Sequence, residues 1–321
     1  MEGMSLLAAI ISFTGAVLLV PALIPLLRRL KFGQSIREAG PESHQKKTGT
    51  PTMGGVVFLP VIIITAVALS YFYGELTEKV IALVIALTGF GLIGFLDDYI
   101  KVAKKRNLGL TSLQKLLAQI AVALVTFFVL RDVFDTAVSI PFTAFEVELS
   151  WAYALFIVFW MVGFSNAVNL TDGLDGLVAG TSSAAFAAFG FFALLRQEEG
   201  IAIFAFAAVG GMLGFLVHNK FPAKLFMGDT GSLALGGALA MISILLELEL
   251  LLLLIGIVFV IETLSVILQV ASFKLRKKRI FKMSPIHHHF ELIGWSEWKV
   301  VSIFWSAGLL AAVLALWLEV I

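Results

Sequence analysis

Ten apolar segments, each close to the length of a membrane-spanning helix, divide this chain of 321 residues. Crossing the hydrocarbon layer takes about 20 mostly apolar residues in a helix. Because 60% of the residues are hydrophobic and only 14% are charged, a soluble globular enzyme is excluded. The sequence therefore predicts an all-α polytopic membrane protein, with one integral membrane domain over residues 1–321. The segments cover approximately residues 4–27, 53–71, 79–96, 113–130, 151–168, 177–195, 201–217, 232–247, 250–273 and 300–320.

Two of these segments, 201–217 and 232–247, are short for a span, so we expect them to be tilted or buried within the bundle. The basic residues fix an orientation, because Lys and Arg near helix ends favour the cytoplasm. With the amino terminus outside, 20 of the 23 basic residues lie in or beside the inner loops, and only Lys79, Arg131 and Arg196 lie outside. Ten spans then place both termini on the outer side. In the outer loop, residues 136–140 and 145–149 predict a small hairpin.

The acidic and histidine residues also gather on the predicted inner side. Five of the seven aspartates and all five histidines, including His44 and His218, lie there. Charged groups at a membrane boundary are costly to desolvate, so a cluster of them indicates function. The chain has no cysteine, which excludes thiolate metal sites and thiol nucleophiles. We therefore expect an active-site cleft at the cytoplasmic face.

Three motifs carry these aspartates. Asp97 and Asp98 follow the third apolar segment, and adjacent carboxylates repel unless a cation lies between them. Oxygen ligands suit Mg²⁺, although a solvated helix end is the simpler alternative. The second motif, Asn169 to Gly176, places Asn169, Asp172 and Asp175 along one face if it is helical, or in an Asx-rich turn. In the third, Asp229 could cap the eighth helix or hold a metal.

Other polar residues near the inner face are less distinctive. Three consecutive histidines, His287 to His289, cannot all face one metal, so imidazoles beside phosphate are more plausible than a zinc site. Glu262 and Gln269 are seven residues apart in the ninth segment, so they share a helix face, which we expect to point into the bundle. Lysines beside Gly and Thr in the block from Lys46 to Gly55 could cradle phosphate, but no Walker pattern is present.

The ordered set of motifs closely resembles the phospho-N-acetylmuramoyl-pentapeptide transferases of bacterial cell-wall synthesis. They belong to the polyprenyl-phosphate N-acetylhexosamine-1-phosphate transferase superfamily. The block from His287 to Glu291 separates this group from its relatives, whose histidine motif differs. The motifs are Thr50 to Gly55, Asp97 to Tyr99, Asn169 to Gly176, Phe226 to Ser232 and His287 to Glu291.

The resemblance implies a reaction in the bacterial plasma membrane. Undecaprenyl phosphate would attack UDP-N-acetylmuramoyl-pentapeptide, giving lipid I and UMP with Mg²⁺ as cofactor. Asp229, Asp97 and Asp98 would be the metal and catalytic residues, joined in catalysis by His289. Asp98 is open to roles as base, nucleophile or positioning group. The resemblance implies no nucleic-acid partner, and it leaves a homodimer open. The substrate-binding residues it implies are Lys47, Thr52, Lys101, Lys115, Asn169, Asp172, Asp175, Asn219, Phe226, Gln269, His287 and His288.

Two other functions are compatible with the sequence. A secondary transporter also has many spans, but it predicts ionisable residues near the bilayer midplane, where only Glu262 approaches. An enzyme of the same superfamily that uses a different UDP-sugar is the nearer alternative.

Overall fold

The computed structural model describes residues 2–29, 47, 49–104, 108–129, 131–134, 136–143 and 145–320. Much of the predicted inner loop 28–52, including His44 and Lys46, lies outside the described residues. Within the described part, ten helices are long and apolar enough to cross a membrane, which confirms the predicted polytopic fold. They are α1 (Glu2–Arg29), α3 (Gly55–Tyr73), α4 (Glu78–Ala103), α5 (Ser112–Val129), α6 (Tyr153–Thr171), α7 (Leu177–Leu195), α8 (Glu199–Asn219), α9 (Gly228–Leu245), α11 (Ile257–Arg276) and α13 (Glu297–Val320).

Helix α9 lies at the centre of the bundle, packed against α3, α4, α6 and α7. Its apolar window is 89% buried, which confirms the expectation that the short segment 232–247 is enclosed by protein. Small residues allow this close packing: a Cβ at Gly236 would lie 2.4 Å from the backbone oxygen of Phe164 in α6. Because α9 is surrounded on all sides, its first turn is held firmly against the ends of its neighbours.

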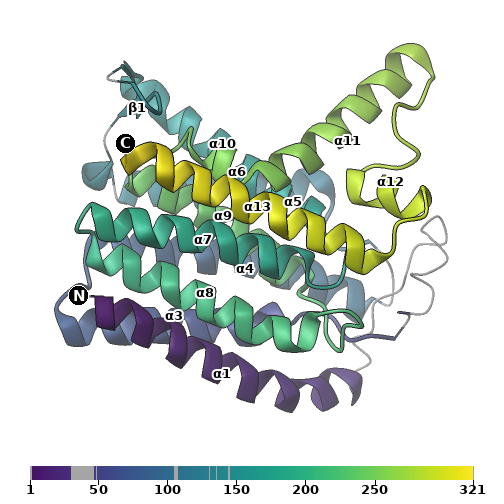
Figure 1. The fold of residues 1–321 in the computed structure, drawn as a ribbon, viewed down its shortest axis with the longest axis horizontal. Coiled ribbons are helices and arrows are strands. Elements are labelled where there is room, and N and C mark those ends of the chain that lie inside the picture. The colour runs from purple at the N-terminus through teal and green to yellow at the C-terminus, as the bar shows by residue number, and fades with distance from the viewer. Residues whose placement is uncertain are drawn as a thin grey trace.

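Both termini lie at one end of the bundle, as an even number of spans requires (Figure 1). The same end carries the antiparallel pair β1 (Ala137–Ser139) and β2 (Glu146–Glu148), in which Val138 faces Val147, so the predicted hairpin is confirmed. The short helix α12 (Ile286–Leu292) lies at the opposite end (Figure 1). The two ends of the bundle therefore differ chemically. The predicted site residues lie at the end of the bundle that carries α12.

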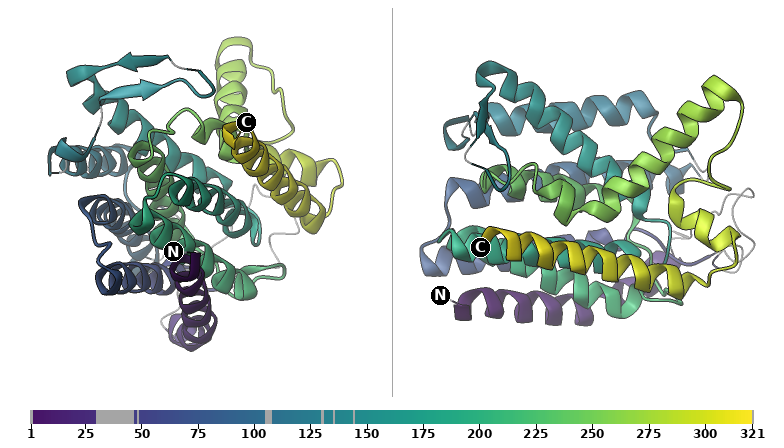
Figure 2. Two further views of the ribbon diagram at one scale, coloured as in Figure 1. Left: turned by 60° about the vertical axis from the view of Figure 1, so that its left-hand side comes forward. Right: turned by 45° about the horizontal axis from the view of Figure 1, so that its top comes forward.

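The ninth predicted segment, 250–273, is not one helix. It breaks at Gly256 into a single turn, α10 (Leu252–Ile255), and the long helix α11. Gly256 leaves helical geometry at this point, with φ −92° and ψ 24°. Beyond the break, α11 leans away from the other spans, as both Figure 1 and the right view of Figure 2 show. On this side α11 still contacts α6, α12 and α13.

A small apolar cluster at this end ties α11, α13 and the turn before α7 together. Ile286 and Phe290 of α12 pack against it, so α12 is anchored rather than loosely attached. The buried members of the cluster are Leu174, Leu177, Val258, Val300, Val301 and Phe304.

Candidate active site

Three carboxylates from two helices meet at the end of the bundle that carries α12. Asp97 and Asp98 lie in α4 and Asp229 lies in the first turn of α9, with one oxygen from each within 4.8 Å of the others. The pair lies in the last two turns of α4, which continues past the predicted boundary at residue 96 to Ala103. Asp97 and Asp98 are each only 3% exposed. The alternative of a solvated helix end is therefore excluded.

Gly94 allows α4 to approach the start of α9 this closely. A Cβ at Gly94 would lie 2.1 Å from the backbone oxygen of Asp229 and 2.5 Å from the backbone nitrogen of Thr230. Only a residue without a side chain fits there. Because Gly94 is one helical turn before Asp98, this backbone contact sets the distance between the aspartate pair and Asp229.

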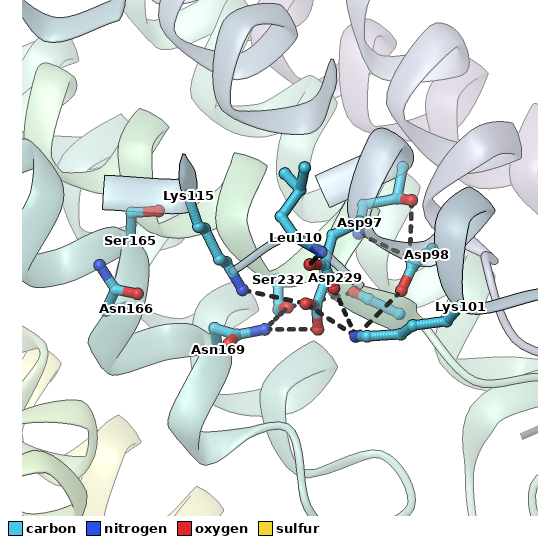
Figure 3. A network of polar contacts seen from close by, with 12 residues as sticks. Asp97, Asp98, Lys101, Leu110, Lys115, Ser165, Asn166, Asn169, Asp229 and Ser232 are labelled. Carbon is cyan, nitrogen blue, oxygen red and sulfur yellow. Dashed lines mark hydrogen bonds and ion pairs between the residues drawn. The ribbon is translucent and has the colours of Figure 1, made fainter. Parts of the chain in front are cut away.

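One oxygen of each carboxylate is held by a hydrogen bond from the protein (Figure 3). The fixed donors are Leu110 N to Asp97 Oδ1 at 2.8 Å, Thr230 N to Asp98 Oδ2 at 3.0 Å, and Asn169 Nδ2 to Asp229 Oδ1 at 2.9 Å. The Thr230 hydroxyl also donates to Asp98 Oδ2, at 2.8 Å. These bonds orient the second oxygen of each group.

Two lysines neutralise part of this negative charge and reach Asp229 from different helices (Figure 3). Lys115 Nζ of α5 lies 2.9 Å from Asp229 Oδ2. Lys101 Nζ of α4 lies 3.1 Å from the same oxygen and 2.6 Å from Asp97 Oδ2. The Asp229 side chain makes no capping bond to α9, whose N-cap is Met227, so the capping role is wrong. An all-oxygen set of three carboxylates is chemically suited to Mg²⁺.

The motif Asn169 to Gly176 does not form one helical face. Helix α6 ends at Thr171, so Asn169 is helical while Asp172 and Asp175 lie in the following turn. Asp172 is half-buried, and desolvation, then the negative charges of Asp229, Asp98 and Asp175, raise its pKa to about 8. At neutral pH this carboxyl is mostly protonated. A bound cation nearby would favour its ionised form.

Asp175 belongs to a second buried cluster. Lys47 Nζ lies 2.7 Å from Asp175 Oδ1 and 2.5 Å from Glu297 Oε1, which also accepts a 2.8 Å hydrogen bond from the Asp175 backbone nitrogen. Asn219 Oδ1 accepts a hydrogen bond from Gly176 N at 3.0 Å. This cluster joins Lys47, the turn 172–176 and the start of α13. Lys47, Asp175 and Asn219 therefore hold the loops around the site.

The predicted residues Thr52 and Phe226 belong to two segments that pair next to the carboxylates. Phe226 N donates to Pro51 O at 2.9 Å and Phe226 O accepts from Gly54 N at 2.8 Å, which pairs the two segments. Gly228 follows with φ +75°, and a Cβ there would lie 2.5 Å from Asp98 Oδ2 and 3.0 Å from Thr52 Oγ1. Gly228 therefore keeps open the space between Thr52 and Asp98.

Comparison with known proteins identifies the family. The model of glycosyl transferase family 4 matches residues 80–247, just over half of the chain. A phospho-N-acetylmuramoyl-pentapeptide-transferase signature matches residues 47–59. The proteins of that name from Bacillus subtilis (strain 168) and Oceanobacillus iheyensis are 58% identical over 321 residues and 59% identical over 318 residues. The alignments cover 100% and 98% of this chain, and 99% and 98% of those proteins. The chain belongs to the phospho-N-acetylmuramoyl-pentapeptide-transferase family.

The regions matched to the transferase family contain the carboxylate cluster and, apart from Glu297, the second cluster. The signature over residues 47–59 includes Lys47 and Thr52. The family model over residues 80–247 includes the three carboxylates, both site lysines and the turn with Asp172 and Asp175. The histidine block lies beyond these two matched regions, but the alignment with the Bacillus subtilis relative extends over it.

The first histidine of that block is not accessible. His287 is 0% exposed, and its Nδ1 lies 3.1 Å from Oε1 of Glu262, which is also 0% exposed. A Cβ at Gly173 would lie 2.2 Å from His287 Nε2, so the imidazole packs beneath the turn that carries Asp172. The prediction that Glu262 points into the bundle is confirmed. The contact with His287 accounts for a buried acid at this position without a transport pathway.

The other two histidines and Gln269 are half-buried or contact the loop after α11. His289 Nδ1 accepts a 3.1 Å hydrogen bond from Lys282 N, and His288 Nδ1 lies 2.9 Å from Glu291 Oε2. The Gln269 side-chain oxygen accepts bonds from Ile280 N at 2.8 Å and Phe281 N at 3.0 Å, and its amide nitrogen donates to Phe281 O. Gln269 therefore supports the loop that leads to α12.

Glu297 belongs to the second buried cluster, and sequence reasoning missed it. Its only signal is an isolated acid at the inner boundary of the last apolar segment, in a place where acids also occur as solvated helix ends. Its partners, Lys47 and Asp175, are 250 and 122 residues away along the chain. Such a distant pairing depends on the packing of α13 against α7.

Replacing Glu297 with Gln is expected to lower the free energy of unfolding by about 1.5–3 kcal/mol, because a buried hydrogen bond between charged groups is weakened. The matched control is Glu319→Gln, since Glu319 and its partner Arg196 are 31% and 35% exposed. Exposed ion pairs contribute about 0–1 kcal/mol. Thermal unfolding in detergent measures both variants, and equal melting temperatures for the two would contradict the buried role of Glu297.

Proposed function

We propose that this chain transfers phospho-N-acetylmuramoyl-pentapeptide from its UDP carrier to undecaprenyl phosphate, forming lipid I and UMP. The observation that carries the proposal is the cluster of Asp97, Asp98 and Asp229 with two lysines at one end of a membrane bundle. One substrate is a lipid whose phosphate lies at the membrane surface, and the other is a soluble diphosphate. A polar site at a bundle end is where two such substrates can meet.

Mg²⁺ is the cofactor that this site suits. Asp97, Asp98 and Asp229 would hold it, since each offers an oxygen and no nitrogen or sulfur donor is among them. When bound, Mg²⁺ neutralises charge on phosphate oxygens, on which phosphoryl transfer largely depends. Lys101 and Lys115 add positive charge at the same place. The chain's own part is to position the two phosphates and exclude other nucleophiles.

Asp98 acts in this scheme as a positioning group. Its Oδ2 accepts two hydrogen bonds from Thr230, and the side chain is only 4% exposed, which restricts its movement toward a phosphorus atom. A phosphate monoester has a second pKa of about 6, so the lipid phosphate needs little help from a base at neutral pH. The attacking oxygen is therefore already ionised when it arrives.

The remaining site residues divide by their surroundings. Thr52, Asn169, Asp172, Phe226, His288 and His289 are partly accessible and are available to the nucleotide, the diphosphate and the sugar. Lys47, Asp175, Asn219, Gln269 and His287 serve mainly by holding the loops that shape the site.

Release of UMP tests the proposal. Purified protein is incubated with undecaprenyl phosphate, Mg²⁺ and either UDP-N-acetylmuramoyl-pentapeptide or UDP-N-acetylglucosamine. We expect UMP only with the first sugar nucleotide and none without the lipid phosphate. Release of UMP with UDP-N-acetylglucosamine alone would assign the chain to a different reaction of the superfamily.

The proposed site faces the cytoplasm of a bacterial cell, with both termini outside, in one membrane domain that works as a monomer or a homodimer. The chain has no cysteine, so single cysteines report sidedness. Lys278→Cys, in the loop between α11 and α12, and Glu146→Cys, in the hairpin, are both at exposed positions. In intact cells an impermeant thiol reagent is expected to label only Glu146→Cys. Labelling of Lys278→Cys from outside would reverse the topology.

A further inference from the structure

The three carboxylates use their six oxygens unequally. Fixed donors from Leu110, Thr230 and Asn169 take one oxygen of each group. The oxygens left over are Asp97 Oδ2, Asp98 Oδ1 and Asp229 Oδ2. Lys101 Nζ approaches all three of these, at 2.6, 3.8 and 3.1 Å respectively. The ammonium of Lys101 therefore approaches every oxygen that has no fixed donor from Leu110, Thr230 or Asn169, and it shares one of them, Asp229 Oδ2, with Lys115 (Figure 3).

A divalent cation bound by the three carboxylates needs the same oxygens, because the other three are held by protein donors. Two cations cannot share these oxygens at such distances without strong repulsion in a partly buried place. We propose that Lys101 is an internal counter-ion of the carboxylate cluster that leaves when a divalent cation binds. Its ammonium then becomes available to a substrate phosphate. This last step rests on the proposed transferase function, whereas the exchange of cations does not.

Of the two lysines at the carboxylates, Lys101 has the side chain that can move more easily. Its side chain is 32% exposed, compared with 17% for Lys115. It follows Asp97 and Asp98 by one helical turn in α4, so a change of side-chain rotamer withdraws the ammonium without moving the backbone. Lys115 contacts a single carboxylate oxygen, Asp229 Oδ2, which also accepts from Lys101. Departure of Lys101 frees one acceptor position on that oxygen, so Lys115 can stay. The exchange therefore requires movement of one flexible side chain.

Amine labelling of the unaltered protein tests the exchange. The purified protein in detergent is acetylated briefly at increasing Mn²⁺ concentration, without substrates, and modification of each lysine is read by peptide mass spectrometry. We expect acetylation of Lys101 to rise several-fold and to level off with Mn²⁺ saturation, while Lys79 at the opposite end stays constant. Unchanged or reduced acetylation of Lys101 at saturating Mn²⁺ would overturn the proposal.

Direct Mn²⁺ binding, measured by electron paramagnetic resonance of the free ion, gives an independent test. Lys101→Met is expected to tighten Mn²⁺ binding about tenfold, because it removes a competing cation. Lys115→Met, which removes the same charge from one carboxylate contact, is the matched control and should have a smaller effect. Equal effects of the two substitutions, weaker binding by Lys101→Met, or no binding by any form would each contradict the proposal.

These readouts separate the proposal from the transferase assignment. Expected Mn²⁺ results without UMP release would leave the exchange standing and remove the assigned reaction. UMP release without any change in Lys101 acetylation on Mn²⁺ binding would support the assigned reaction and remove the exchange.

Discussion

Replacing Asp229 with Asn is expected to reduce Mg²⁺-dependent UMP release by about a thousandfold while leaving the protein folded. Asp229 is the carboxylate that both Lys101 and Lys115 contact, and it shares the three-carboxylate cluster with Asp97 and Asp98. The amide keeps the shape of the side chain and its bond from Asn169, but it removes the charge that a divalent cation requires. Loss of a few kcal/mol of transition-state stabilisation corresponds to this change in rate.

Glu247→Gln is the matched control for this substitution. Glu247 is exposed and lies just beyond the other end of α9. The substitution therefore removes one negative charge, as Asp229→Asn does, but far from the site. We expect unchanged UMP release for Glu247→Gln and closely similar melting temperatures for both variants. Full activity of Asp229→Asn would remove Asp229 from the metal site.

The second large effect is expected from the smallest possible change in the packing of α4 against α9. Gly94→Ala places a methyl group where 2.1 Å separates it from the backbone oxygen of Asp229. Because that neighbour is backbone, the two helices must separate, which costs about 1–3 kcal/mol in overpacking. The separation also moves Asp229 away from Asp97 and Asp98. We expect a lower melting temperature and loss of UMP release by about a hundredfold.

Gly163→Ala provides the control for Gly94→Ala. Gly163 lies within α6, and a Cβ added there meets nothing within 4 Å. Alanine favours helix over glycine at both positions, so helix propensity cannot explain a loss at residue 94. Equal activity of the two variants would show that the α4–α9 contact does not set the geometry of the site.

Apolar segment lengths predicted the spans well, because each helix must cross the same thickness of hydrocarbon. They failed where protein, rather than lipid, decides the end of a helix. Helix α4 continues past Asp97 because its last turns pack within the site, and the charged residues there are paired with each other. The break at Gly256 was also missed, since apolar residues surround it on both sides and leave the hydropathy pattern unchanged.

The sequence likewise predicted one part of the candidate site and missed another. The three carboxylates could be found from local motifs and from their common side of the membrane, and the structure brings them together. The partners could not be found, because Lys47 meets Glu297 across 250 residues only through tertiary packing. His287 is buried against Glu262. Three identical residues in a row give no sign in the sequence of which one is buried.

The most direct test of the account locates the metal. Crystals grown with Mn²⁺ and measured at a wavelength with strong manganese anomalous scattering show where the ion binds. We predict one peak between Asp97, Asp98 and Asp229, within about 2.0–2.6 Å of a carboxylate oxygen of Asp229. A peak at the histidine block instead, or no peak near Asp229 at saturating Mn²⁺, would contradict the account.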